Sequence, residues 1–392
     1  MKRDLALYLV SEVILDIGIG LFQYAQPFYY VAHGASDAMV GFQFALNALC
    51  GGVGALLFGP VADYIGASKV WKATSFGLAL GYLITALTHT VLLWSVGSIV
   101  TGLSAALLMS TENVVLKTLS SDREMASVLS KFVALYSFVI GAGSVASGWV
   151  SAASGYGTAV VVGALVTLAA MPIRLFTKGR DTKTHTAFRR PSRRILAMSG
   201  YACMFGIGMA LVNQFATIII HRQLGMSTHG TAIVAAGGTF MVSLGSLFVS
   251  ALLRKFRRNS TLGLSYVATI GLTLGLTFFR NPGAYSALYL ARTATTSIPG
   301  PIVDAAFLEL TPVTDFSQMF GVRVFGTNVG TSVGSFAGGA LVGARALGWL
   351  AVLSAAVFVA AGVYLIVLLR RISQVPGQPA YAMQRETDAT SL

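Results

Sequence analysis

The chain has 392 residues, of which 55% are hydrophobic and only 10% are charged, whereas about 25% of the residues of a soluble domain are charged. Long apolar runs recur from end to end with short polar breaks, which excludes a series of soluble domains and indicates an all-α polytopic membrane protein. Cys50 and Cys203 suggest neither a disulfide framework nor a metal site. The net charge of +13 is explained below by where the basic residues lie.

The apolar runs predict twelve transmembrane helices at about 20 residues per crossing. All of them are expected to be helices, because an open sheet edge would leave backbone groups unpaired in lipid. In chain order their expected limits are 5–32, 37–62, 70–88, 91–117, 126–151, 157–177, 195–221, 229–253, 261–279, 284–310, 317–343 and 347–369.

The longest polar break, TKGRDTKTHTAFRRPSRR, separates the spans into two sets of six. We therefore expect an N-terminal six-helix bundle over 1–177 and a cytoplasmic basic linker over 178–194. A C-terminal six-helix bundle is expected over 195–372, followed by a cytoplasmic polar tail over 373–392.

Basic residues are distributed very unequally between alternate loops. The side of the N-terminus carries 23 of the 27 lysines and arginines, including Arg174, whereas the other side carries only Arg222, Arg280 and Arg345. The positive-inside rule places both termini in the cytoplasm, and we expect a plasma membrane, the bacterial inner membrane. The basic excess is thus a topology signal that also suits contact with anionic lipid head groups, and we expect no nucleic-acid partner.

The two halves of the sequence repeat at an offset of 191 residues. Gln23-Tyr24-Ala25 matches Gln214-Phe215-Ala216, and GSVASG at 143–148 matches GSFAGG at 334–339. Because each half holds an even number of spans, the halves are expected to have the same orientation. Parallel repeats of this kind are typical of transporters that handle substrate near the midplane.

The stretch GPVADYIGASK, residues 59–69, lies in the expected loop between the second and third spans. It resembles the signature loop of the major facilitator superfamily, in which Gly59, Asp63, Gly66 and Lys69 fill the characteristic places. LDIGIGLFQYAQPFY in the first span resembles the drug/proton antiporter branch of that superfamily. The resemblance implies two pseudo-symmetric six-helix bundles, alternating access, and a gating or structural role for the four loop residues, with Asp63 as a conformational latch.

One acid and one base occur at matched depths in both halves. Glu112 and Lys131 in the first half correspond to Asp304 and Arg323 in the second, because 304 − 112 and 323 − 131 both equal 192. Each acid can pair with the base on the next span. A duplicated pair favours a gating or structural role over a substrate site.

Glu12 and Asp16 in the first span have no acidic counterparts in the second half. They lie one helical turn apart, near the face that carries Gln23. Two carboxylates so close together in a partly dry site repel each other, which favours binding of a proton. We therefore expect Asp16 and Glu12 to couple transport to protons. The alternatives are that Asp16 is bonded to Asn47, Tyr24 or the backbone, and that Glu12, which lies nearer the cytoplasm, pairs with a basic loop residue.

Arg292 lies inside a span and must have a partner, since a buried cation is costly. It could neutralise Asp16, bind an anionic substrate group, or form a static pair. Together with it, we expect the substrate site to include Gln23, Tyr24, Asn47, Asn213 and Gln214, although buried amides also commonly join helices.

These features favour a monomeric, proton-coupled secondary transporter that exports small amphipathic organic molecules, with protons and a small molecule as its partners. The alternative within transport is uptake of an organic anion with protons, with Arg292 as the anion receptor. A non-transporting receptor or scaffold is a third possibility. The sequence shows no nucleophile–base pair and no Walker-type loop, so we expect no enzyme activity, no catalytic residues, no metal and no cofactor.

Overall fold

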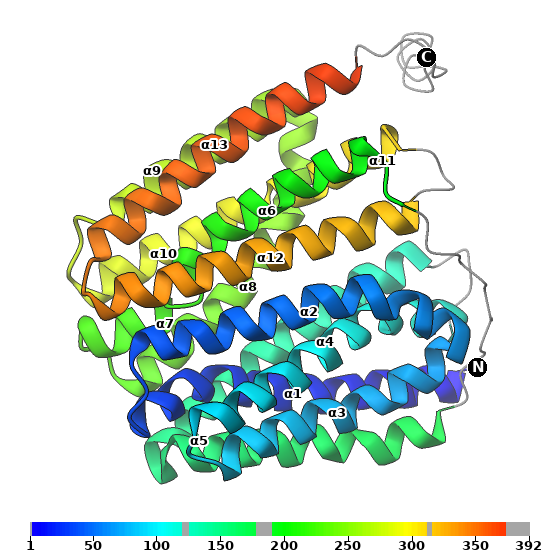
Figure 1. Ribbon diagram of the computed structural model, residues 1–392, viewed down its shortest axis with the longest axis vertical. Helices are drawn as coiled ribbons and strands as arrows, with labels where there is room; N and C mark the ends of the chain where they lie inside the picture. Colours follow the sequence, from blue (N-terminus) through cyan, green and yellow to red (C-terminus); the bar gives the residue numbers. More distant parts are fainter. Residues whose placement is uncertain (1, 120–124, 178–189, 312–315, 374–392) are drawn as a thin grey trace.

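The computed structural model describes residues 2–119, 125–177, 190–311 and 316–373, and these residues are helical almost throughout (Figure 1). The predicted linker over 178–194 and tail over 373–392 lie mainly outside the described residues. The elements are α1 (Lys2–Ala32), α2 (Asp37–Ile65), α3 (Ala67–Leu87), α4 (Val91–Leu119), α5 (Met125–Phe176), α6 (Arg193–Asn213), α7 (Ala216–Ile218), the π-helix η1 (Ile219–Gln223), α8 (Thr228–Lys255), α9 (Arg258–Gly275), α10 (Pro282–Ser297), α11 (Pro299–Glu309), α12 (Phe316–Gly343) and α13 (Leu347–Ser373).

Eight helices within the described ranges are long and apolar enough to cross a membrane. One of them, over Phe132–Phe176, has 45 residues and suffices for two crossings. It is broken at Gly155, whose φ of 84° is readily adopted only by glycine. The chain doubles back there, since Ile140 on one arm and Thr167 on the other both pack closely against neighbouring glycines of α1. The two spans predicted at 126–151 and 157–177 therefore correspond to the two arms of α5.

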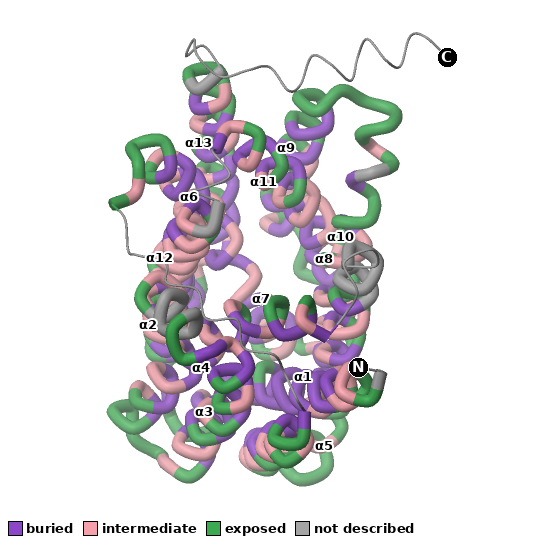
Figure 2. The backbone as a smooth tube through the Cα atoms, turned by 90° about the vertical axis from the view of Figure 1, so that its right-hand side faces the viewer, coloured by how far each residue is buried: buried purple, intermediate pink, exposed green. Residues whose placement is uncertain are grey.

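The helices form two bundles (Figures 1 and 2). In the first, α1 packs along α5, and α4 packs against α2 and α3; in the second, α6 packs against α12 and α13, and α10 packs against α8 and α9. The side carrying Lys2, Ile65 and Ser373 is called the terminal side below. The side carrying Asp37, Arg222 and Arg345 is called the distal side.

The two bundles are related by the predicted repeat. Adding 191 to the start of α2 gives 37 + 191 = 228, the start of α8, and adding it to the start of α5 gives 125 + 191 = 316, the start of α12. The bundles meet mainly where α2 packs on α12 and α5 packs on α8. Because the repeat exchanges these two contacts, the interface between the two bundles is itself pseudo-symmetric.

Two spans that were predicted as continuous are interrupted. The span predicted at 195–221 breaks after Asn213 and continues as α7 and η1, and the span predicted at 284–310 breaks at Ile298 between α10 and α11. Pro299 begins α11 and has no backbone N–H to donate to the preceding turn, which accounts for the second break. Broken helices of this kind commonly surround binding sites in transporters.

Several contacts hold the bundles together at the distal side. A Cβ added to Gly339 of α12 would lie 2.8 Å from the Cα of Gly41 in α2, so the two backbones touch. The Tyr24 hydroxyl donates to the Thr228 carbonyl at 2.7 Å, and Arg222 forms an ion pair with Asp37 at 2.7 Å. These contacts close the distal side in this structure.

Candidate functional site

Glu12 lies in a buried ion pair inside the first bundle. The residue is 1% exposed, and its Oε2 accepts from Nη2 of Arg174 at 2.9 Å. Its Oε1 accepts from the indole Nε1 of Trp71 at 2.7 Å. Both carboxylate oxygens are therefore held by donors from α5 and α3. In this structure Glu12 is paired with a basic residue, as in the alternative given above, although that residue is not in a loop.

Arg174 was grouped in the sequence with the basic residues of the loops, and the structure corrects this. Its side chain is fully buried near the end of α5, with the guanidinium 4.5 Å from the centroid of the Trp71 ring. Its Nη1 also donates to the Trp71 carbonyl at 3.0 Å and to Thr74 Oγ1 at 3.1 Å. Arg174 lies three residues before the end of the span predicted at 157–177, and this position was the signal in the sequence that its side chain could be buried.

Asp16 is the buried acid of α1 that lacks such partners. The residue is 7% exposed, and within the described residues its carboxylate accepts no hydrogen bond and forms no ion pair. The charged groups close enough to act on it are Glu12, Glu112 and Arg174. Two acids and one base thus surround Asp16 in the described part of the chain, and the base is already engaged by Glu12.

The other residues that were predicted near Asp16 differ in how far they are exposed and in what they contact. Gln23, two turns beyond Asp16, is exposed, although most of the residues around it on α1 are buried. Tyr24 is buried, and its hydroxyl is used in the bond to Thr228. The Asn47 amide donates to the Ser98 carbonyl at 3.1 Å and joins α2 to α4. Neither Tyr24 nor Asn47 bonds to Asp16, so those two suggested partners were wrong.

Arg292 is fully buried in the second bundle and does not contact Asp16. Its Nε donates to Thr273 Oγ1 at 2.9 Å, and its Nη2 donates to the Gly208 carbonyl at 3.2 Å and to Ser354 Oγ at 3.3 Å. Its Nη1 donates to Oδ1 of Asn213. Every partner described for this guanidinium is neutral, so the suggested pairing with Asp16 is absent.

The break after α6 places two of the predicted substrate residues together. Asn213 is the last residue of α6 and Gln214 begins the turn, and both are partly exposed. Through its bond to Arg292, Asn213 links this break to the buried cation. The remaining side of the Asn213 amide makes only a long contact, 3.9 Å, with Met209 Sδ. Asn213 therefore has hydrogen-bonding capacity left for another molecule.

The duplicated pair was predicted correctly where the structure describes it. Arg323 Nη1 lies 2.8 Å from Asp304 Oδ1, and both side chains are about one quarter exposed. Glu112 is described, but the side chain of Lys131 lies outside the described residues. The side chain of Asp63 and the surroundings of Gly59 lie outside them as well. Gly66 precedes α3 with φ 111°, and Lys69 is exposed in its first turn.

A family model described as Major Facilitator Superfamily matches residues 8–294 and 197–389 of the chain. No curated protein gives a significant match. The two matched segments together cover residues 8–389, nearly the whole chain.

Several solved structures share the fold. A bacterial homologue of the iron transporter ferroportin, crystallised in an inward-facing state, is similar with a TM-score of 0.75 and 13% identity over 94% of this chain and 99% of that chain. A bacterial homologue of the lysosomal transporter Spinster, inward-facing and unoccupied, gives 0.74 and 11% over 97% and 99%. The nucleoside transporter NupG gives 0.73 and 13% over 94% and 100%.

Proposed function

The chain belongs to the major facilitator superfamily and is a multi-pass membrane transporter, and from this premise we propose that it is a proton-coupled exporter of small amphipathic organic compounds. In this proposal Asp16 is the carboxylate that exchanges the coupling proton. The terminal side faces the cytoplasm, as the basic residues of the sequence favour. The solved relatives differ in their named cargo, iron or nucleoside, so the shared fold leaves the substrate open.

The observation that carries this proposal is the contrast between the two acids of α1. Glu12 is neutralised by Arg174 and held by Trp71, so its charge is balanced within the bundle. Asp16, one turn further along, has no such partner in the described part of the chain. An ionisable residue inside a membrane span is by default a candidate for a functional site. An acid without a fixed cation can exchange a proton as its contact with water changes. We assign Glu12 the supporting role of holding Arg174.

The export of amphipathic compounds rests on two further features. The sequence of the first span resembles that of the drug/proton antiporter branch, and aromatic rings pack together near Asp16. Phe22 stacks on Tyr82 with ring centroids 3.6 Å apart, and Asp16 is close enough to act on Tyr82 electrostatically. Aromatic faces favour organic cations. A substrate cation arriving there would be attracted to Asp16 and displace its proton.

Transport in proteoliposomes with an imposed pH gradient tests the proposal, with ethidium as the amphipathic cation. The parent should accumulate ethidium against its concentration gradient, whereas Asp16→Asn should reduce gradient-driven flux at least tenfold. Asp4→Asn, the same change at the start of the same helix, is the matched control and should retain the flux. Equal gradient-driven flux in the parent and Asp16→Asn would remove Asp16 from the mechanism.

The second candidate function is proton-coupled uptake of an organic anion, with Arg292 as the receptor. It is favoured by the neutral surroundings of Arg292 and by its link to Asn213 at the break of a span. With benzoate as the probe, uptake should acidify the lumen of the vesicles, and Arg292→Gln should abolish both signals. Benzoate entry that is absent in the parent would reject this candidate without affecting the ethidium test.

A further inference from the structure

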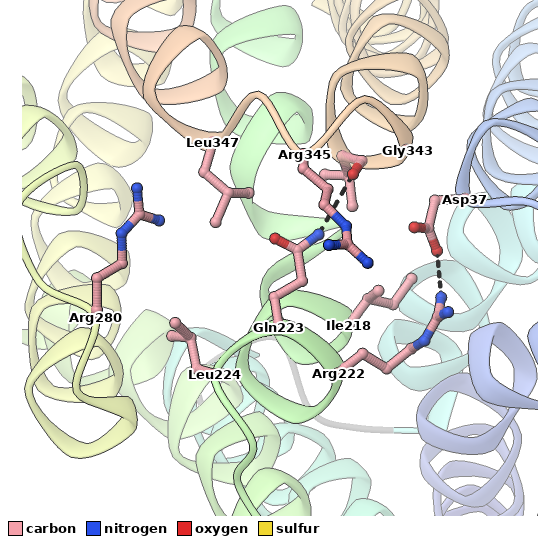
Figure 3. Close-up of a pocket in the computed structure, with 10 residues that line it drawn as sticks. Asp37, Ile218, Arg222, Gln223, Leu224, Arg280, Gly343, Arg345 and Leu347 are labelled. Carbon is pink, nitrogen blue, oxygen red and sulfur yellow. Dashed lines mark hydrogen bonds and ion pairs between the residues drawn. The ribbon is translucent and has the colours of Figure 1, made fainter.

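A cavity of about 680 Å³ lies at the distal side, and Asp16 is not among the residues that line it (Figure 3). Its volume lies in the range of about 300–1,000 Å³ that is usual for sites that bind small molecules. It is lined by three separate connections of the second bundle and by the start of α2 in the first bundle. The lining residues are Asp37, Ile218, Arg222, Gln223, Leu224, Arg280, Val342, Gly343, Arg345 and Leu347.

Charge is concentrated at this cavity. The three basic residues that the sequence assigns to the distal side, Arg222, Arg280 and Arg345, all line it, and Asp37 is its only acidic residue. The formal balance is three positive charges minus one negative charge, which leaves +2. Asp37 is already paired with Arg222. Arg280 and Arg345 are exposed, and no hydrogen bond or ion pair from either side chain is found among the described residues.

The side chains that line the cavity suit a ligand that has both an anionic group and an apolar part. Figure 3 shows Arg280 and Arg345 on different walls, with Leu347 drawn between them and Leu224 on the wall below Arg280. Arg345 has φ 54°, the one positive φ outside glycine in the described chain, and this conformation costs about 1–2 kcal/mol for an ordinary residue. Guanidinium groups bind phosphate and carboxylate through paired hydrogen bonds, and the leucines offer an apolar surface.

We propose that this cavity binds the oxyanion group, a phosphate or a carboxylate, of an amphipathic molecule that reaches the distal side. Arg280 and Arg345 bind the oxyanion, and Leu224 and Leu347 contact the apolar part. The site is separate from Asp16, and its existence does not depend on proton coupling or on the direction of transport. A dissolved organic anion and the head group of an anionic lipid share this chemistry, and the experiment below separates the two sources.

The first arm uses calorimetric titration of the detergent-purified protein with phenyl phosphate and, for comparison, inorganic phosphate. Phenyl phosphate should bind more tightly, and its affinity should fall as salt is added, because exposed charges are screened. Arg280→Gln/Arg345→Gln should weaken binding at least tenfold. Arg193→Gln, which removes an exposed arginine from the terminal side, is the matched control and should bind like the parent.

The second arm places the same proteins in nanodiscs of phosphatidylglycerol or phosphatidylcholine and measures retained lipid by native mass spectrometry. Loss of retained phosphatidylglycerol in the double variant alone identifies a lipid head group as the ligand, whereas an effect confined to phenyl phosphate identifies a dissolved anion. Either result supports the site, provided that the double variant elutes and melts like the parent. Binding that is equal in the parent and the double variant in both arms, or absent from the parent in both, overturns it.

Discussion

At the scale of single residues, the Glu12–Arg174 pair shows how the first bundle tolerates charge within a span. Each carboxylate oxygen of Glu12 accepts a short hydrogen bond, and Arg174 is further held by the Trp71 and Thr74 oxygens. Burying two ions is costly, and their attraction offsets this cost only when the geometry and the extra hydrogen bonds are good. The pair therefore acts as one unit that joins α1, α3 and α5.

Removing one partner of this pair should destabilise the protein strongly. Arg174→Gln leaves Glu12 buried without its cation and should lower the free energy of unfolding by about 3–5 kcal/mol. The double variant Glu12→Gln/Arg174→Gln should recover part of the loss, because no isolated charge remains. Thermal unfolding in detergent, followed by tryptophan fluorescence, measures both, with Arg193→Gln as the exposed control. A melting temperature for Arg174→Gln equal to that of the control would contradict the account.

Arg292 offers the corresponding test in the second bundle. Arg292→Lys keeps the charge but cannot reach Asn213, Thr273 and Gly208 together, because an ammonium group has no planar fork. Each lost bond to a charged group is worth about 1.5–3 kcal/mol, so a loss of at least about 2 kcal/mol is expected in the same unfolding assay. Arg280→Lys, which changes an exposed arginine, is the control and should unfold like the parent. If Arg292→Lys and Arg280→Lys changed the free energy of unfolding equally, the planar guanidinium of Arg292 would be unimportant for stability.

The residue scale is also where sequence reasoning was least complete. It identified Asp16, Glu12 and Arg292 as unusual because ionised groups rarely occur inside apolar runs. It paired Asp304 with Arg323 from the repeat, and the ion pair is present. It could not assign Arg174 to Glu12, because the two are 162 positions apart and only the fold brings them together.

At the scale of elements, the contact between α2 and α12 depends on the absence of side chains. A Cβ on Gly339 would meet the Asp37 carbonyl oxygen and the Gly41 Cα, each at 2.8 Å, and backbone atoms cannot move aside easily. Small residues allow helices to approach in this way. The same contact lies near the Asp37–Arg222 ion pair, so the ends of the two helices close the distal side together.

Gly339→Ala should therefore loosen the closed distal side. The test uses a protein in which Cys50 and Cys203 are replaced by serine and Ser335→Cys supplies one thiol at a buried position. This thiol should react with a membrane-impermeant maleimide several-fold faster when Gly339→Ala is present than when Gly339 is kept. Gly321→Ala on the same helix is the matched control, because a Cβ there meets nothing within 4 Å. Equal labelling rates in the two alanine variants would show that this contact does not hold the distal side closed.

The elements themselves could be predicted closely from the sequence, for a physical reason. In lipid the backbone must bond to itself, so an apolar run of sufficient length has few alternatives to a helix. The breaks at Asn213 and Ile298 were missed, because hydropathy measures apolar content and not the continuity of the backbone. Pro299 marked the second break, whereas no proline or glycine marks the first.

At the scale of the whole molecule, two homologous bundles carry different chemistry. The first contains the acids Glu12 and Asp16, and the second contains Arg292 among neutral partners. The duplicated features, such as the glycine-rich helices and the acid–base positions of Asp304 and Arg323, are the ones that we expect to have a structural or gating role. The features present in one half alone are the ones we assign to proton and substrate. The repeat could be detected in the sequence, and so could this asymmetry.

The central claim is that a substrate cation and a proton exchange at Asp16. It is tested most directly by adding the transported cation to the detergent-solubilised protein in weakly buffered solution and recording the pH with an indicator dye. The account predicts that the parent and Asp4→Asn release protons as the cation binds, whereas Asp16→Asn binds the cation with little or no release. Proton release by Asp16→Asn equal to that of the parent would contradict it.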